Sequence, residues 1–152
     1  MQKLLSREEY KNHLEEIKNI SCRFCESDTQ IIIKEFKYFK WIFNIAPYYK
    51  YHTMLIPDRH ILKITDMTAD EWQEWKTIHE HIKGKFKQEF GTNQLMVMVR
   101  EFYGDTDKVE YYKPEHLHIS YINDKIGDFE KLNLDLTAKD VDFKNFIKII
   151  NS

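Results

Sequence analysis

Residues that break or cross-link a chain are scarce in this sequence. Its 152 residues include 3 prolines, 4 glycines and 2 cysteines. We find no stretch rich in glycine, proline or serine, no low-complexity tract and no internal repeat, so the pattern excludes a linker-rich or repeat protein. The two cysteines lie together as Cys22-Arg-Phe-Cys25. In a reduced compartment this spacing indicates half of a metal site or a redox pair more than a structural disulfide.

An excess of charge of one sign and long apolar runs are also lacking. The 23 basic and 25 acidic residues give a net charge of −2, so no global field would draw the protein onto nucleic acid or an anionic membrane. No stretch approaches the roughly 18 uncharged residues needed to cross a bilayer. The first 20 residues carry charges throughout and do not read as a signal peptide. These features predict a cytoplasmic protein without a membrane partner, and they make nucleic acid an unlikely ligand.

Length and patterning predict one globular domain over residues 1–152, of the α+β class. Hydrophobic residues make up 42% of the chain and charged residues 32%, a balance typical of globular proteins. Ser6 and Thr68 are placed to cap helices, and Gly91 is placed to end one. The predicted helices cover 7–18, 69–89 and 142–150. The predicted strands cover 30–45, as two strands or one bent hairpin, then 51–57, 95–99 and 116–122, of which the last two are expected to pair.

The last predicted strand carries the clearest chemistry, as His116-Leu-His118-Ile-Ser120-Tyr-Ile122. Because successive side chains of a strand point to opposite faces, His116, His118 and Ser120 are expected to share one face. The apolar side chains between them are expected to pack on the long helix. Two imidazoles and a hydroxyl on one surface are suited to nucleophilic or metal chemistry. Two histidines on a polar sheet face can equally be an accident of composition.

A second segment, residues 44–61, makes the pattern specific. Together with the cysteine pair and a helix opened by Met67-Thr-Ala-Asp-Glu, the two segments resemble the histidine-triad (HIT) family over roughly residues 20–122. The matching positions of residues 44–61 are Asn44, Pro47, His52, Leu55, Ile56, Pro57 and His60. The resemblance implies a HIT-like antiparallel sheet of about five strands, with the long helix across one face and a short N-terminal helix. It also implies a homodimer, since many members of the family pair by extending the sheet.

The same resemblance assigns roles to the motif residues. His118 would be the nucleophile that attacks the α-phosphorus of a nucleotide and forms a nucleotidyl-histidine. Asn44 would bind ribose hydroxyls, and His52 would lie close to the phosphate. Side chains from 32 to 43 would supply an apolar slot for the base. For zinc, the family and the related nucleotidyltransferases imply a Cys2His2 set formed by Cys22, Cys25, His60 and His116.

The chain departs from the family pattern at Ser120, where hydrolases usually carry histidine and the uridylyltransferase-like branch carries glutamine. Ser120 would still help to hold the phosphate and the leaving group, with a shorter side chain and one hydroxyl donor. The loop before the motif, residues 110–115, also differs and offers Lys113 as a phosphate contact, although a lone loop lysine is more often merely solvated.

The predicted function is hydrolysis at the α-phosphate of a dinucleoside polyphosphate or nucleoside phosphoramidate. The alternatives are a nucleotidyltransferase or phosphorylase of the same superfamily, a zinc-stabilised nucleotide-binding protein with little catalysis, and, less favoured, nucleic-acid end processing. Other conspicuous side chains are interpreted as structural. Trp72 and Trp75 are expected in the core or a dimer contact, His13, His79 and His81 at surface or half-buried positions, and the tyrosines of residues 48–51 on the surface or at an interface.

Overall fold

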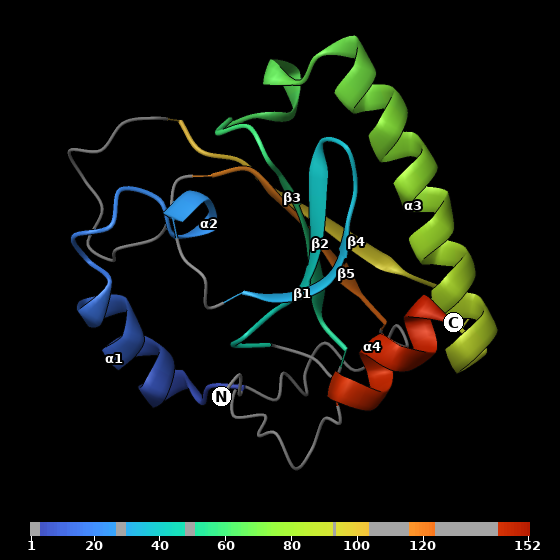
Figure 1. Cartoon of the computed structure of the whole chain (residues 1–152), viewed down its shortest axis with the longest axis horizontal. Helices are drawn as coiled ribbons and strands as arrows, with labels where there is room; N and C mark the ends of the chain where they lie inside the picture. Colours follow the sequence, from blue (N-terminus) through green and yellow to red (C-terminus); the bar gives the residue numbers. More distant parts are fainter. Residues whose placement is uncertain (1–3, 27–29, 48–50, 93, 104–115, 124–142) are drawn as a thin grey trace.

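A five-stranded antiparallel sheet forms the centre of the computed structural model (Figure 1). The structure describes residues 4–26, 30–47, 51–92, 94–103, 116–123 and 143–152. The strands are β1 (Ile31–Glu35), β2 (Phe39–Phe43), β3 (Thr53–Pro57), β4 (Met96–Arg100) and β5 (His118–Ile122), in the spatial order β1-β2-β3-β5-β4. The predicted α+β class and the sheet of about five strands are therefore confirmed, and residues 30–45 form two strands.

Two of the helices begin where their capping residues predict, and the longer of the two also ends there. The helices are α1 (Arg7–Glu16), α2 (Arg23–Glu26), α3 (Ala69–Phe90) and α4 (Phe143–Asn151), with a short 3₁₀ turn, η1 (Ile64–Asp66). Ser6 and Thr68 each form a capping box with the glutamate three residues later. Gly91 ends α3 with a left-handed backbone, at φ 60°. None of the described helices is long and apolar enough to span a membrane.

One face of the sheet is covered by α3 and α4, which lie together on the same side in Figure 1. Ile78, Ile82 and Phe86 of α3 are buried against this face, as is Phe146 of α4. The strands contribute alternate residues to the same core, among them Trp41, Leu55, Ile119 and Tyr121. Burial of these large apolar side chains supplies the main stabilisation of the fold.

The opposite face of the sheet carries the chemically interesting side chains. A smaller buried cluster lies there, formed by Cys22 and Phe24 with Ile42, Met54 and Ile56. Because side chains alternate along a strand, the β3 residues on either side of Leu55 point to this second face. His118 and Ser120 alternate in the same way with the core residues of β5. Helices α1 and α2 lie on this side of the sheet (Figure 1).

The structure corrects three of the predictions from sequence. Strand β4 is not buried: it lies at the edge of the sheet, and Met98 and Val99 are 38% and 40% exposed. Strand β5 begins at His118 rather than at residue 116. Tyr51 is not a surface residue, because it is half-buried and stacks on Phe90 with ring centroids 4.7 Å apart. Residues 48–50 and 110–115, including Lys113, lie outside the described residues.

Candidate functional site

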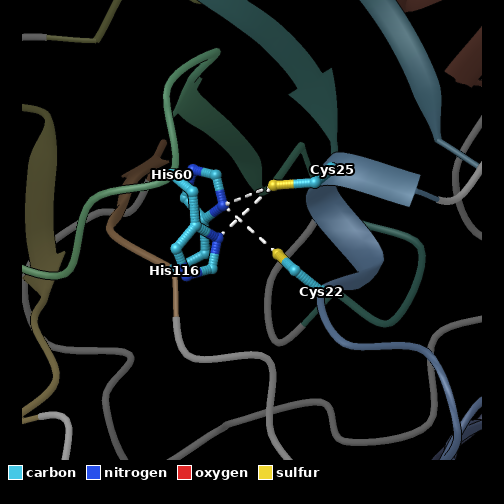
Figure 2. Close-up of side chains that lie close together, drawn as sticks. All are labelled: Cys22, Cys25, His60 and His116. Carbon is cyan, nitrogen blue, oxygen red and sulfur yellow. Dashed lines mark hydrogen bonds between the residues drawn. The ribbon is translucent and has the colours of Figure 1, made fainter.

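Four residues from distant parts of the chain meet beside α2. They are Cys22, Cys25, His60 and His116, whose candidate ligand atoms all lie within 4.8 Å of one another. Figure 2 shows the two cysteines facing the two imidazoles. The Sγ atom of Cys22 lies 3.3 Å from Nδ1 of His116, and the Sγ atom of Cys25 lies 3.4 Å from Nδ1 of His60. Cys22 and His116 are buried, whereas Cys25 and His60 are exposed.

The spacing of these donors fits a tetrahedral metal ion. With Zn–S near 2.3 Å and Zn–N near 2.0–2.1 Å, tetrahedral geometry places sulfur and nitrogen ligands about 3.6 Å apart. The sulfur–nitrogen distances of 3.3 to 3.5 Å in the cluster are close to that separation. Two thiols and two imidazoles are also the donor types that zinc prefers in closed structural sites. The four residues therefore fit zinc, as the resemblance implied.

A backbone contact prepares His116 for this role. Its Nε2 lies 2.9 Å from the carbonyl oxygen of Pro57. Because a carbonyl can only accept a hydrogen bond, Nε2 must carry the proton, and the lone pair of a neutral ring then lies on Nδ1, facing the cysteines. Although Cys25 is exposed, partial desolvation of its thiol, followed by the hydrogen bond and charge of Cys22, raises the pKa of Cys25 to about 11. A bound cation would oppose that effect by stabilising the thiolates.

A cavity of about 350 Å³ lies next to the cluster, on the same face of the sheet. Its lining combines positive, aromatic and sulfur-containing side chains with the predicted motif residues. The lining residues include Arg7, Tyr10, Arg23, Phe24, Asn44, His52, Met98, Arg100, Glu101, Phe102, His118 and Ser120. The structure thus brings together His118, Ser120, His52 and Asn44, the four residues predicted to act on a nucleotide.

His118 is held in the opposite sense to His116. Its Nδ1 lies 2.9 Å from the carbonyl oxygen of His116, so Nδ1–H donates and Nε2 carries the lone pair of the neutral ring. The ring is also packed beside Phe24, with centroids 5.6 Å apart. Burial first, with the nearby positive charges of Arg100 and Arg23 contributing, lowers the pKa of His118 to about 4. A neutral, oriented imidazole at the wall of a cavity has the properties of a nucleophile.

His52 and Asn44 form a second polar group in the cavity wall. Nδ2 of Asn44 lies 3.3 Å from Nδ1 of His52, and Oδ1 of Asn44 accepts a hydrogen bond from the backbone N–H of Ala46 at 2.9 Å. Burial, followed by the charge of His118, lowers the pKa of His52 to about 3. His52 is therefore neutral near pH 7, and the amide that contacts it has a fixed orientation.

Ser120 lies two residues beyond His118 on the same face of β5. It is 6% exposed and pairs across the sheet with Met54 of β3 and Met98 of β4. These neighbours are apolar and flexible, so the serine hydroxyl is the polar group that β5 presents beside His118. His116 and His118 both contact Phe24 on this face of the sheet, where alternation places them. The ring of His116 lies in the cysteine cluster, however, and does not line the cavity.

Several residues of the cavity wall were not predicted from the sequence, because they belong to no recognised motif: Arg7, Tyr10, Arg23 and Arg100. Helix α1 brings Arg7 and Tyr10 to the cavity, and the end of β4 brings Arg100. Arg23 alone carried a signal, because it lies between the two cysteines of the predicted metal site.

The predicted base slot of residues 32–43 does not line this cavity in the structure. Phe39 and Trp41 are buried under α3, and Ile32 is 43% exposed. Apolar contacts in the cavity come instead from Phe24, Met98 and Phe102 and their neighbours.

The remaining aromatic residues have structural contacts. Trp75 is partly buried and donates from Nε1 to the Tyr121 hydroxyl at 3.1 Å, as expected for a core contact, whereas Trp72 is 42% exposed and is not in the core. His13, His79 and His81 are half-buried, as expected. His79 additionally contacts the hydroxyl of Tyr121 at 3.3 Å.

Comparisons with known proteins agree with this architecture. A model of the HIT domain matches residues 25–121. A Zn-bound histidine triad family protein from Mycobacterium smegmatis has a similar structure, with a TM-score of 0.63 at 18% identity over 87% of this chain and 94% of that chain. A HIT-like protein involved in cell-cycle regulation from Bartonella henselae, solved with an unknown ligand, also has a TM-score of 0.63, at 16% identity over 96% of this chain and 97% of that chain.

A hypothetical histidine triad nucleotide-binding protein from Sulfolobus tokodaii has a TM-score of 0.61 at 19% identity, over 85% of this chain and 89% of that chain. No curated protein sequence shows significant similarity to the chain. The structural likenesses establish the fold. The match to the HIT domain includes both histidine-bearing segments and Cys25, and it begins after Cys22. On this match, the chain belongs to the HIT domain family.

Proposed function

We propose that this protein is a nucleotide hydrolase that acts at the α-phosphate of a nucleoside derivative through a covalent nucleotidyl-His118. The observation that carries the proposal is the orientation of His118, whose Nδ1–H is held by the carbonyl of His116 at 2.9 Å while the ring lines the cavity. The nucleotide-binding designation of the Sulfolobus tokodaii neighbour supports the same class of ligand.

In the proposed reaction the lone pair of Nε2 attacks the α-phosphorus, and the bond from phosphorus to the leaving group breaks with its electron pair. The proton stays on Nδ1, and its hydrogen bond to the carbonyl of His116 stabilises the positive charge that the ring gains. Water then attacks the phosphorus, and the bond from phosphorus to Nε2 breaks with its electron pair, which restores the neutral histidine. The proton that water loses passes to the departing leaving group or to solvent, and a nucleoside monophosphate is released. Asn44 and His52 would orient the nucleotide, and Ser120 would donate to a phosphate oxygen.

We also propose that Cys22, Cys25, His60 and His116 bind a structural zinc ion. The supporting observation is a closed set of four donors, with His116 already fixed by Pro57. All four positions of a tetrahedral zinc ion would be filled by side chains, so the ion would stabilise the fold instead of binding substrate. The Zn-bound neighbour from Mycobacterium smegmatis supports this assignment.

The test of the enzymatic proposal is turnover of a panel of dinucleoside polyphosphates, adenosine phosphoramidate and sugar nucleotides, followed by chromatography. We expect the parent protein to release a nucleoside monophosphate and His118→Ala to lose nearly all of this activity. His81→Gln, on the opposite face of the sheet, is the matched control and should keep it. Release of a monophosphate by His118→Ala at the parent rate would contradict the mechanism.

Ser120 favours a second candidate function, nucleotide binding with little catalysis. A serine side chain is shorter than the usual histidine, and it is enclosed here by Met54 and Met98. Binding of nucleotides by the parent protein without turnover of any member of the panel would select this function. Transfer to inorganic phosphate instead of water would select a phosphorylase.

We expect the protein to form a homodimer, as the HIT-like architecture suggests. Strand β4 lies at the sheet edge and exposes Met98 and Val99, so its backbone offers a surface for pairing with a second copy. Sedimentation equilibrium should give twice the mass of one chain. A single chain mass at micromolar concentration would contradict this expectation.

A further inference from the structure

Arginine is rare in this protein and is concentrated at one place. Only four of the 23 basic residues are arginines: Arg7, Arg23, Arg59 and Arg100. Three of the four line the cavity beside His118, and no lysine of the described residues does so. Arginine binds phosphate through a planar fork of donors, whereas lysine acts as a point charge, so this choice of residue has chemical meaning.

Arg23 is a buried cation in a prepared position. Its exposure is 8%, and its guanidinium lies 4.8 Å from the centre of the Phe24 ring and 5.3 Å from that of Tyr10. Nη1 donates to the Tyr10 hydroxyl at 2.6 Å. One hydrogen bond and two ring faces leave most donors of the guanidinium for another partner. Since Arg23 lies between Cys22 and Cys25, the position of these two cysteines determines where its guanidinium is held.

Arg100 faces the same cavity from the sheet. It pairs directly with His118 across β4 and β5, and directly opposite residues of an antiparallel pair project on the same face. Arg7 approaches from the start of α1. Its Nη2 donates to the carbonyl oxygen of Ala46, and it also donates to that of Pro47 at a distance of 2.9 Å. The three arginines therefore reach one cavity from three elements, which are the start of α1, the start of α2 and the end of β4.

The charges of Arg23 and Arg100 are not neutralised by an ion pair within the described part of the cavity. Glu101 is the acidic residue of the lining, and its carboxylate accepts a hydrogen bond from the backbone N–H of Ile64 at 2.7 Å. Among the described residues, neither Arg23 nor Arg100 forms an ion pair with a carboxylate. Arg59, the arginine outside the cavity, shows the contrast, because it contacts the Glu71 carboxylate at 2.8 Å. Arg23 is buried, and a buried cation without a counter-charge is costly unless a ligand supplies one, whereas Arg100 is exposed and carries no such cost.

We propose that Arg7, Arg23 and Arg100 form an anion subsite for the phosphates beyond the α-phosphate, so that the preferred ligands are nucleoside polyphosphates rather than compounds with an uncharged leaving group. The inference rests on the proposed function for the nucleoside end of the ligand. The arginines themselves are specificity-determining residues, and they supply charge that the short Ser120 side chain lacks.

The test is equilibrium binding in a His118→Ala background, which prevents turnover, with zinc-loaded protein and without added magnesium. The probes are AMP, ATP and inorganic tripolyphosphate. We expect ATP to bind at least about tenfold more tightly than AMP, and Arg23→Gln or Arg100→Gln to weaken ATP binding by about 10- to 100-fold. Binding of AMP should change by less than about threefold. Lys83→Gln removes one positive charge from the exposed face of α3 and should change neither affinity.

Arg23→Lys keeps the charge of the buried side chain and guards against misfolding, and it should retain part of the preference for ATP. Equal affinity for AMP and ATP in the His118→Ala protein with all three arginines intact would overturn the inference while leaving the proposed function standing. Equal losses of AMP and ATP binding in Arg100→Gln would also overturn it. Arginine-dependent binding of tripolyphosphate without binding of either nucleotide would keep the anion subsite and remove the proposed function. Failure of all three probes to bind would overturn both.

Discussion

The metal cluster and the arginine-lined cavity lie side by side on one face of the sheet, yet they hold their histidines by opposite ring nitrogens. In the cluster, Nε2 of His116 donates to the carbonyl of Pro57, and Nδ1 faces the cysteines. In the cavity, Nδ1 of His118 donates to the carbonyl of His116, and Nε2 keeps the lone pair. Phe24 lies against both rings, with centroids 5.8 and 5.6 Å away.

A backbone carbonyl decides which ring nitrogen of each histidine is left with the lone pair. Both rings are buried and have a lowered pKa, to about 4 in each case, so burial alone does not distinguish them. In the cluster, His60 and two cysteines occupy the space in front of the free nitrogen. In the cavity, that space is lined by side chains that suit an anion. A closed donor set favours stability, and an open one favours chemistry.

The largest expected effect is on the cluster. Replacing both cysteines, Cys22→Ser and Cys25→Ser, should abolish zinc binding and lower the free energy of unfolding by several kcal/mol, because metal binding stabilises only the folded state. Zinc content is measured by atomic emission after zinc-supplemented expression. It should fall from about one zinc ion per chain in the parent to less than about 0.2 in the variant, which would show that the site no longer binds zinc. Thermal unfolding gives the change in stability.

If the double variant unfolds at the parent temperature, the cluster is not a structural metal site. The variant also tests whether the two regions are coupled through α2. Since Arg23 and Phe24 lie between the cysteines, we expect weaker ATP binding in any folded fraction.

The second expected effect is confined to the cavity. His118→Gln should reduce turnover by about 10³-fold or more, since it removes the nucleophile. It should leave zinc content unchanged, because the hydrogen bond of His118 is accepted by the backbone carbonyl of His116 and not by a candidate metal-ligand atom. His116→Gln is the matched variant and should do the reverse, with loss of zinc and a smaller loss of turnover. A loss of zinc in His118→Gln would show that the two histidines do not have separate roles.

The third effect is a pH dependence of stability that originates in His52. Burial lowers its pKa in the folded state to about 3, below the ordinary histidine value of 6.5 that applies to the unfolded chain. Between these values the unfolded state binds more protons, so stability falls as the pH falls, by about 1.4 kcal/mol per pH unit. His52→Gln should flatten the slope of unfolding free energy between pH 7 and pH 5, measured in denaturant. Identical slopes for the parent and the variant would show that His52 is not buried neutral.

The smallest effect is expected at Ser120. Ser120→Ala removes one hydroxyl donor and should lower turnover by about 3- to 10-fold, the value of a single hydrogen bond. Ser120→Thr keeps the hydroxyl and serves as the control. No change in Ser120→Ala would mean that the arginines alone stabilise the phosphate.

Much of the fold could be predicted because its signals are local. Ser6, Thr68 and Gly91 fixed the ends of two helices through capping, and the dense β-branched and aromatic residues of 30–45 indicated strands. The edge position of β4 could not be predicted, because a short apolar run such as residues 95–99 is compatible with either a central strand or an edge strand.

The site divides in the same way. The cysteine and histidine motifs could be matched to a family pattern, and the structure brings Cys22, Cys25, His60 and His116 together. Strand alternation could not separate the roles of His116 and His118, because it places both on one face and does not show that His116, which precedes β5, lies beside the cysteines. Arg7 and Arg100 could not be predicted, since their place in the cavity depends on how α1 and the sheet edge pack.

The most direct test of the central claim is to trap the covalent intermediate. The protein would be mixed with a substrate identified in the panel, quenched at alkaline pH within one turnover and mapped by peptide mass spectrometry. We expect one nucleoside monophosphate group on the peptide that contains residues 116–122, located on His118 and absent from His118→Gln. A group located on His116, or full turnover with no adduct on any histidine, would contradict the assignment of the two rings.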